Sequence, residues 1–403
     1  MIKTEFIIVG AGLSGLTCAM ELQRNHKDYI LIDGLDRVGG RVGSIKDNGF
    51  ILDLGFQVYN TAYSFGNKVL DIEQLDFCSF KPGAAIYDGF KFRILSDPFR
   101  DPEQLFSNIF SNISKLSDKI RVLTLKGHLK NYNLKNDKSD DITTLKYLKN
   151  RGFSNRFIEQ FFSPFFSGIF LESKLETSSK FFKYVFSNFN SGNAAIPRMG
   201  MQEIPNQIYN KLAKDKVILN NQISFIEDDN IIISESGKKF KADKVVLTGK
   251  SQELNNSKKL KYNSVRCFYF SSMFEPEYSN YIHLFPFEEH INNIAVISAV
   301  SDAYTPNFES LFSVSVIRAS IKSENLILQI QYKLAKIYGG NASEYKFLKY
   351  FDLQKATTQQ LPGHFQYLDH GNKMIHYAGD TTTIGSIDGA IESGLITSKK
   401  LLK

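Results

Sequence analysis

Hydrophobic and polar positions in the first 60 residues predict a strand, a glycine-rich turn, a helix and a second strand. Residues 5–9 (EFIIV) form an apolar run that suits a strand buried on both faces. Residues 16–24 carry an apolar face at helical spacing, and residues 29–32 (YILI) form another buried run. Because strand, helix and strand in this order build a parallel sheet, the pattern predicts an α/β domain.

Two later stretches repeat this alternation of strands and helices. Residues 195–248 contain a helix followed by strand-like runs, and residues 376–402 contain a strand followed by a long apolar helix. The first 60 residues supply too few strands for a complete sheet, so later chain must return to it. We therefore expect residues 1–60, 191–250 and 354–403 to form one α/β domain from discontinuous segments.

The remaining chain predicts a second domain. Residues 61–190 and 251–353 are expected to form an α+β substrate domain, or cap, with a mixed sheet and helices. Strand-like runs occur at 91–95, 266–271, 293–300 and 311–317, and helical patterns at 105–129 and 155–190.

The helical pattern of residues 155–190 is the richest aromatic region of the chain. Its phenylalanines are Phe157, Phe161, Phe162, Phe165, Phe166, Phe170, Phe181, Phe182, Phe186 and Phe189. An aromatic stripe at helical spacing is typical of core packing. The same stripe also suits an apolar tunnel for a bulky substrate or a membrane-docking face, and these interpretations stay open.

Composition narrows the compartment and the partners. The length of 403 residues favours two packed domains, and the net charge of +7 comes from lysines mixed with acidic residues. Such scattered charge indicates a solvated surface and no nucleic-acid partner. Cys18, Cys78 and Cys267 are too far apart for a CxxC pair, which argues against a disulfide framework and a metal site and favours the reducing cytoplasm.

Two further observations concern membranes. The apolar run at Phe6 begins too near Met1 to leave room for a signal peptide, so we expect none. No uninterrupted apolar run approaches the roughly 20 residues that span a bilayer. A peripheral membrane contact remains compatible with the sequence.

The turn after the first strand carries the first chemical signal. Gly10, Gly12 and Gly15 follow the GxGxxG spacing and enclose Leu13 and Ser14. The first glycine permits a tight turn, the second lets backbone approach a pyrophosphate, and the third lets helix and strand pack closely. Asp33 then ends the second strand, where a carboxylate can accept hydrogen bonds from a ribose. The context predicts a dinucleotide site, with the phosphates at a helix N-terminus.

The residues after Asp33 resemble a known family. Arg37, Gly39, Gly40 and Arg41 match the (D/E)RxGGR segment of the flavin amine oxidase, protoporphyrinogen oxidase and phytoene desaturase superfamily. The resemblance implies FAD, with this loop against the pyrophosphate. The usual acid of the family at the strand end is Glu, whereas this chain has the shorter Asp33. The aromatic segment 152–179 resembles the amine oxidase-like subgroup.

Other segments extend the resemblance along the chain. It implies that Gly55, Phe56 and Gln57 lie beside the isoalloxazine ring and that Ile223 meets the adenine. Residues 197–201 resemble the PxGGM element, with Met199 in place of its first glycine. The C-terminal flavin signature implies that these residues contact the ribityl chain and ring: Gly379, Asp380, Ser386, Ile387 and Ala390. The dipole of the helix that starts there would stabilise reduced flavin.

The resemblance implies an FAD-dependent oxidoreductase that dehydrogenates an apolar or amine-bearing small molecule by hydride transfer to flavin N5, with oxygen or a quinone as acceptor. Alternatives are a redox-neutral flavin-dependent isomerase or a desaturase of a polyene or isoprenoid, and a non-catalytic FAD-binding protein. No catalytic residue is evident, although Tyr377 is one candidate for an aromatic pair at an amine. Since no Cys lies near the C-terminal signature, we expect non-covalent FAD.

Overall fold

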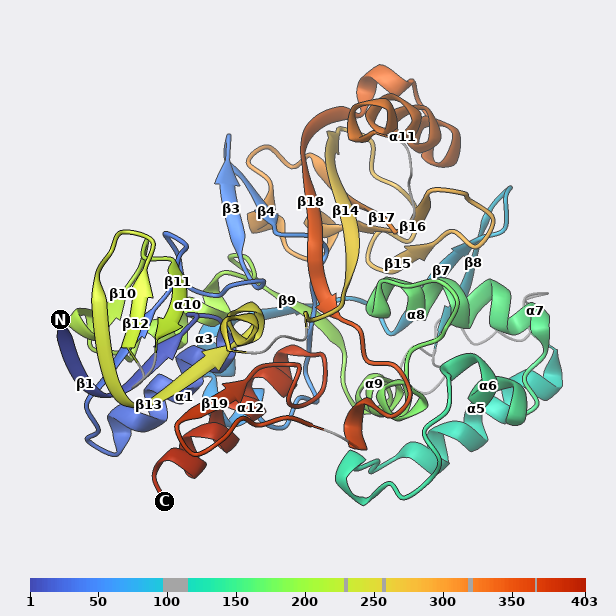
Figure 1. Cartoon of the computed structure of the whole chain (residues 1–403). Coiled ribbons are helices and arrows are strands. Elements are labelled where there is room, and N and C mark those ends of the chain that lie inside the picture. The colour runs from blue at the N-terminus through green and yellow to red at the C-terminus, as the bar shows by residue number, and fades with distance from the viewer. Residues whose placement is uncertain (97–114, 228–230, 256–258, 318–321, 367) are drawn as a thin grey trace.

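A computed structural model describes residues 1–96, 115–227, 231–255, 259–317, 322–366 and 368–403. Its two large sheets lie side by side, one near the chain termini and one beside α11, as Figure 1 shows. We call them the first sheet and the cap sheet. Within the described residues, no helix is both long and apolar enough to cross a membrane.

The first sheet joins segments that are far apart in the sequence. Its parallel strands are β1 (Ile2–Val9), β2 (Tyr29–Ile32), β10 (Val217–Ile218), β13 (Lys239–Thr248) and β19 (Ile375–Ala378). The antiparallel strands β11 (Ile223–Glu227) and β12 (Ile231–Ser234) complete the order β10-β2-β1-β13-β12-β11, and β19 pairs with β13. This arrangement confirms the predicted α/β sheet from discontinuous segments.

The register of these strands places four chain segments at one edge. Val9 pairs with both Ile32 and Leu247, and the next residue of β13, Thr248, pairs with Ala378. The carboxyl ends of β1, β2, β13 and β19 therefore lie together. In open α/β sheets this edge is where ligands bind.

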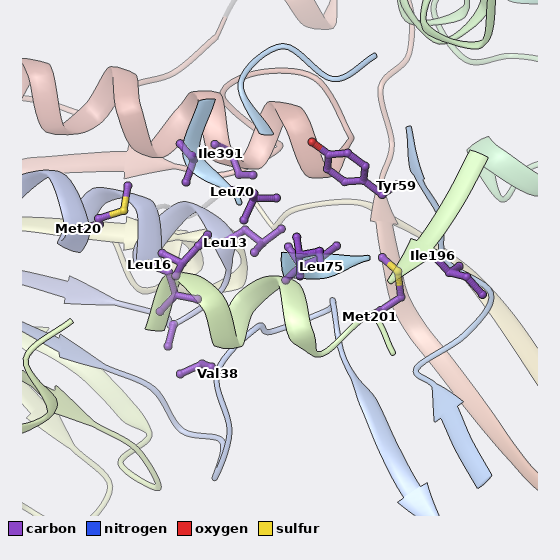
Figure 2. Packing of buried hydrophobic residues seen from close by; sticks show 14 of the residues in the cluster. Leu13, Leu16, Met20, Val38, Tyr59, Leu70, Leu75, Ile196, Met201 and Ile391 are labelled. Atoms are coloured by element: carbon purple, nitrogen blue, oxygen red, sulfur yellow. The ribbon is translucent and has the colours of Figure 1, made fainter. Parts of the chain in front are cut away.

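Helices α1 (Leu13–Arg24), α10 (Glu203–Asn210) and α12 (Ile387–Leu401) belong to this part of the molecule. Figure 2 shows Leu13, Leu16 and Met20 of α1 in the same apolar cluster as Ile391 of α12. An added Cβ on Gly394 would lie 2.5 Å from the carbonyl oxygen of Ser14, so α1 and α12 can approach only because α12 has glycine there. This contact joins the two ends of the chain.

The cap sheet has the order β18-β14-β17-β16-β15-β7-β8. Its strands are β7 (Gly83–Tyr87), β8 (Phe92–Ser96), β14 (Tyr262–Ser272), β15 (Ile282–Leu284), β16 (Ile291–Val296), β17 (Ser310–Val316) and β18 (Lys346–Thr358). Helix α11 (Ser323–Tyr338) lies against it at the top of Figure 1. The run predicted at 293–300 thus ends as a strand at Val296 and continues as a short 3-10 helix.

The boundary expected after residue 353 falls inside β18. This strand pairs with β14 from Tyr262–Thr358 to Ser271–Lys346 and extends toward the first sheet, as the long strands at the centre of Figure 1 show. One continuous strand across this boundary was not predicted, because polar and apolar residues alternate only weakly along residues 346–358. We retain the two-domain division as a proposal.

The helices between residues 116 and 191 form the other part of the cap, and α8 contacts β16 of the cap sheet. They are α5 (Leu116–Leu129), α6 (Thr144–Asn150), α7 (Asn155–Phe157), a π-helical turn (Ile158–Phe162), α8 (Ser163–Phe170) and α9 (Ser179–Ser191). The aromatic segment 155–190 is therefore interrupted after Phe170, where Leu171 adopts φ of 56°. Residues 105–114 of the predicted helix 105–129 lie outside the described residues.

Short elements fill the junction between the sheets. They are β3 (Ser44–Asp47), β4 (Phe50–Asp53), β5 (Tyr59–Asn60), β6 (Phe77–Ser79), β9 (Ala194–Pro197), α2 (Gly66–Val69) and α3 (Ile72–Leu75). The 3-10 helices of the described residues are not confined to this junction, since Ala342–Glu344 contacts α11; they are Leu134–Asn136, Lys214–Lys216, Gly249–Leu254, Ile297–Ala299, Asp302–Tyr304, Ala342–Glu344 and His364–Gln366. The segment from residue 195 was expected to return to the α/β domain. Its first part, strand β9, pairs with β5 and β6 and not with the first sheet.

Candidate active site

A cavity of about 930 Å³ lies between the carboxyl edge of the first sheet and the cap. Every residue assigned above to cofactor binding lines it, with the exception of Gly15. We call the lining residues within 9–41, 221–223, 248–254 and 379–380 the nucleotide side. We call the wall formed by β5, α8, α9 and β15–β17 the cap side. The volume is at the upper end of the range for small-molecule sites.

The glycine turn is as tight as the spacing predicts. Gly10 has φ of 107° and donates its N–H to the Ile32 carbonyl at 2.7 Å. An added Cβ on Gly10 would lie 2.2 Å from Thr248 Oγ1, and one on Gly15 would lie 1.9 Å from the Gly10 carbonyl oxygen. Gly15 therefore stands behind the turn, where it allows α1 to pack on β1.

Asp33 lies at the end of β2, beside this turn. Its Oδ2 accepts the Ala11 N–H at 2.6 Å, and its Oδ1 accepts the Leu35 N–H at 2.8 Å. The side chain is only partly buried, and each carboxylate oxygen can accept a further hydrogen bond. Asp33 thus holds the glycine turn and can also receive a ligand hydroxyl.

The two arginines of the loop after β2 have different partners. Arg37 donates to the carbonyl oxygens of Val38, Val42 and Gly40, the last at 2.7 Å, and so holds the loop together. Arg41 instead forms a bidentate ion pair with Asp380, at 2.8 and 2.6 Å. The sequence did not indicate that the loop of β2 and the end of β19 would be joined by a charge pair.

Asp380 is almost fully buried, and Thr358 Oγ1 also donates to it at 2.9 Å. Burial opposes its negative charge, but Arg41 outweighs that effect and holds the pKa of Asp380 below its usual value. The same pairing raises the pKa of Arg41, although burial works against it. Both groups are therefore charged on the wall of the cavity.

Gln57 supplies a test of whether a polar cofactor fits this wall. Its Nε2 donates to the carbonyl oxygens of Arg41 and Leu54, at 2.8 and 2.7 Å. Carbonyl oxygens only accept, so the amide orientation is fixed and Oε1 is an acceptor. This buried Oε1 has no partner within the described part of the chain. A flavin offers donors at its ribityl hydroxyls and ring N–H, so the residue fits the group.

Helix α12 begins at the same cavity. Ser386 caps it, because its side chain accepts the Gly389 N–H at 2.9 Å, and Ser386, Ile387 and Ala390 line the cavity. Asp388 faces away from the cavity wall and accepts the N–H groups of Phe65 and Gly66, at 2.7 and 2.8 Å. A positive helix end therefore adjoins the cavity, as the C-terminal signature implied.

The cap side has a large apolar part made of aromatic and aliphatic side chains. The apolar lining residues of α8 and α9 include Phe165, Ile169, Phe181, Val185 and Phe189. The other phenylalanines of this region pack into the cap core and include Phe157, Phe162, Phe166, Phe170 and Phe182. The structure thus places the aromatic segment both in a core and along a cavity wall.

Several polar residues on the cap side, or next to it in the case of Tyr63, were missed in the sequence. These are Asn60, Tyr63, Tyr184, Asn188, Asn293 and Ser315. Tyr184 and Asn188 both lie on α9, the others come from separate segments, and no local motif surrounds any of them. Tyr377, the candidate for an aromatic pair, does not line the cavity, and its hydroxyl accepts from Asn255 at 2.9 Å. Its side chain is directed elsewhere because it belongs to β19, within the first sheet.

The donor set of the wall bears on the chemistry available. Among the described residues that line the cavity, none is a cysteine or a histidine. In the same described ranges, no group of three or more His, Cys, Asp or Glu side chains could hold a metal ion. The wall therefore offers backbone, amide, hydroxyl and aromatic groups, with charges concentrated on the nucleotide side.

Comparisons with known sequences cover both the whole chain and short pieces of it. The family model described as flavin containing amine oxidoreductase matches residues 13–402. The Drosophila melanogaster protein named "Possible lysine-specific histone demethylase 1" is 42% identical over 59 residues, 15% of this chain and 7% of that protein. The 4,4'-diaponeurosporene oxygenase of Staphylococcus haemolyticus (strain JCSC1435) is 34% identical over 67 residues, 17% of this chain and 13% of that protein. The aligned region is thus a small fraction of each relative.

Solved structures resemble the chain over its length. Putrescine oxidase bound to putrescine has a TM-score of 0.73 at 15% identity, covering 100% of this chain and 99% of that one. Reduced UDP-galactopyranose mutase has a TM-score of 0.74 at 16% identity, covering 99% of this chain and 95% of that one. At these identities the likeness establishes a shared fold.

Proposed function

The chain belongs to the flavin-containing amine oxidoreductase family, and on that premise we propose that it binds FAD non-covalently in the 930 Å³ cavity and acts on an apolar or amine-bearing small molecule. The family match confirms the resemblance carried by the N-terminal and C-terminal motifs, and with it a flavin oxidoreductase. The observation that carries the FAD proposal is the convergence of both motifs on one cavity. We further propose a cytoplasmic protein, with peripheral membrane contact as an alternative.

The nucleotide side would hold the cofactor. The turn at Gly10 and Gly12 and the first N–H groups of α1 suit the pyrophosphate, and Asp33 suits the ribose. Ile223 and Asn221 suit the adenine, since Asn221 lines the cavity and has a buried Nδ2 without a partner in the described residues. Gln57 and the N-terminus of α12 suit the ring. The absence of cysteine and histidine from the described wall supports non-covalent attachment.

The protein's contribution to catalysis would be placement and exclusion of water. FAD, when bound, supplies the hydride-accepting atom N5. Phe165, Phe181 and Phe189 would press an apolar substrate toward the ring and keep the space dry, because aromatic walls favour burial of apolar surface. The positive end of α12 would favour negative charge on the ring. No acid or base from the protein is required for this role.

A redox-neutral isomerase remains the second candidate, together with a desaturase of a polyene or isoprenoid. It is supported by the structural likeness to reduced UDP-galactopyranose mutase, although that likeness concerns the fold. A non-catalytic FAD-binding protein is a third. The electron acceptor would be oxygen or a quinone for the oxidoreductase, and none for the isomerase.

Reoxidation kinetics separate these candidates. The purified holoprotein is photoreduced without oxygen and then mixed with either oxygen or a soluble quinone, and flavin absorbance is followed. An oxidase is expected to reoxidise rapidly with oxygen, and a dehydrogenase rapidly with the quinone alone. Slow reoxidation with both acceptors would count against the oxidoreductase and favour the isomerase. Metabolite profiling of a deletion strain would then identify the accumulating compound.

A further inference from the structure

Charge is distributed unevenly around the cavity. Its charged lining residues are Asp33, Arg37, Arg41, Lys250, Glu253, Asp352, Lys355 and Asp380. They come from the nucleotide side or from β18. Lys355 of β18 has its Nζ 3.9 Å from Oε2 of Glu253 on the nucleotide side. The described lining residues of β5, α8, α9 and β15–β17 include no charged side chain. A substrate that contacts this wall meets only neutral groups.

Asn293 is a buried polar residue on this neutral wall. It lies on β16, 3% exposed, between the cavity-lining residues Leu284 and Ser315 of the neighbouring strands. Its Oδ1 accepts from the Asn292 side-chain nitrogen at 3.0 Å, and that nitrogen also donates to the Pro164 carbonyl at 3.1 Å. Because the Pro164 carbonyl only accepts, the Asn292 atom must be a nitrogen, and Asn293 must present its oxygen to it.

The remaining group of Asn293 is therefore its Nδ2 donor. This buried nitrogen has no hydrogen-bond partner in the part of the chain that the structure describes. A buried donor without an acceptor costs free energy that a ligand can recover by supplying one. The fixed orientation specifies the missing partner as an acceptor.

Asn60 repeats this arrangement on β5. It is 2% exposed and lines the cavity, and its Oδ1 accepts the Ala62 backbone N–H at 2.9 Å. A backbone N–H only donates, so the orientation of this amide is also fixed. Its Nδ2 likewise has no partner among the described residues. Both buried amides on the cap side thus present unpaired donors.

We propose that the cap side selects an uncharged, mainly apolar substrate that carries a hydrogen-bond acceptor such as a carbonyl oxygen, with Asn293 and Asn60 as specificity-determining donors. This inference rests on the proposed function of the cavity. It narrows the substrate class, because it disfavours both a protonated amine and a pure hydrocarbon. A hydrocarbon would leave both donors unpaired.

A protonated amine meets two obstacles on this wall. It would leave water without finding a carboxylate among the described lining residues of the cap side. It would also face two N–H groups whose positive ends repel a cation. Asp388 lies behind Tyr184, which donates to it at 3.1 Å, but Asp388 is already occupied by the N–H groups of Phe65 and Gly66 and does not line the cavity.

Three ligands that share one phenylbutyl skeleton test the proposal: 4-phenylbutan-2-one, butylbenzene and 4-phenylbutan-2-amine, which is protonated at pH 7. Binding to the FAD-loaded full chain is measured from the change in flavin absorbance. The ketone is expected to have a Kd about 10-fold below that of the amine and about 5- to 10-fold below that of butylbenzene, the latter being the gain from one net hydrogen bond.

Substitutions of Asn293 and Asn60 test whether these two residues cause the preference for the ketone. Asn293→Leu is expected to weaken ketone binding about 5- to 10-fold and to leave butylbenzene binding unchanged, with Asn60→Leu acting in the same direction. Asn325→Leu makes the same chemical change on the exposed surface of α11 and should alter neither affinity. If Asn293→Leu does not fold, Asn60→Leu and the order of the three ligands on the unmodified protein still decide.

The proposal is overturned if the amine binds as tightly as the ketone, if none of the three perturbs the flavin at its solubility limit, or if both variants retain the ketone preference. Failure of the proposed function looks different. In that case the purified chain takes up no FAD, and no ligand experiment can begin.

Discussion

The nucleotide side and the cap side of the cavity are built by different means. The nucleotide side is mostly backbone, with the tight turn at Gly10, the loop through Gly39 and Gly40, and charges at Arg41 and Asp380. The cap side consists of side chains from separate helices and strands, such as Phe165 and Asn293. A wall of backbone tolerates few sequences, whereas a wall of side chains can change its chemistry while the fold persists.

Gly10→Ala is expected to have the largest effect, because it disrupts the glycine turn of the nucleotide side. The new Cβ would lie 2.2 Å from Thr248 Oγ1, at a φ of 107° that side chains rarely adopt. Crowding and backbone strain should each cost about 1 to 3 kcal/mol, so FAD affinity should fall about 100-fold or more. Titration of the apoprotein with FAD, followed by fluorescence quenching, measures the loss.

Gly237→Ala is the matched control for this substitution. Gly237 has φ of 78°, but an added Cβ would meet nothing within 4 Å. It therefore carries the backbone strain without the crowding, and FAD affinity should stay unchanged. Equal loss of FAD in both variants would mean that the turn at Gly10 has no special role in binding.

The stability of the junction between the two sheets should depend on pH through Asp53. This buried carboxylate at the end of β4 accepts from Ser44 Oγ at 2.5 Å, from Met201 N–H and from the Tyr304 hydroxyl. Burial raises its pKa from 3.8 to about 6, although these hydrogen bonds oppose the shift. The folded chain therefore holds the proton more tightly than the unfolded chain, and stability should fall as pH rises from about 4 to about 6.

Asp53→Asn tests this pH dependence. The expected loss in the unmodified chain is on the order of 2 to 3 kcal/mol across that interval, because each pKa unit corresponds to about 1.4 kcal/mol. The variant should lose this slope, which is measured by urea unfolding at several pH values. Asp36→Asn, at an exposed position, should keep it. An unaltered slope in Asp53→Asn would assign the pH dependence to other groups.

The smallest expected effect belongs to a side chain of the cap side. Tyr184→Phe removes the hydrogen bond to Asp388, which should cost about 1 kcal/mol of stability while the FAD content stays the same. Thermal unfolding and flavin absorbance measure the two quantities. Tyr332→Phe, on the exposed face of α11, should change neither. Loss of FAD from Tyr184→Phe would show that the cap side also contributes to FAD binding.

The nucleotide side could be predicted from the sequence more fully than the cap side. The strand at residues 29–32, the turn at Gly10 and the start of α12 at Ser386 were predictable, because a buried strand, a tight turn and a helix cap each require particular residues over a short span. The family resemblance then linked these distant segments to one another. Structure was needed to bring them to one edge of the first sheet.

The cap side was not predictable in the same way. Asn60 and Asn293 are separated by more than half of the chain, and only the folded structure brings both of them to the wall of one cavity. The ion pair of Arg41 with Asp380 likewise depends on tertiary contact, as does the continuation of β18 across the expected boundary. Periodicity reports which face of an element is buried, but not what that face meets.

The most direct test of the account is the flavin content of the purified chain. We predict a yellow protein with one FAD per chain, released into the supernatant on acid precipitation and identified there by mass. A chain that is colourless as purified and shows no affinity for added FAD would contradict the central claim that the two ends of the sequence enclose a flavin dinucleotide.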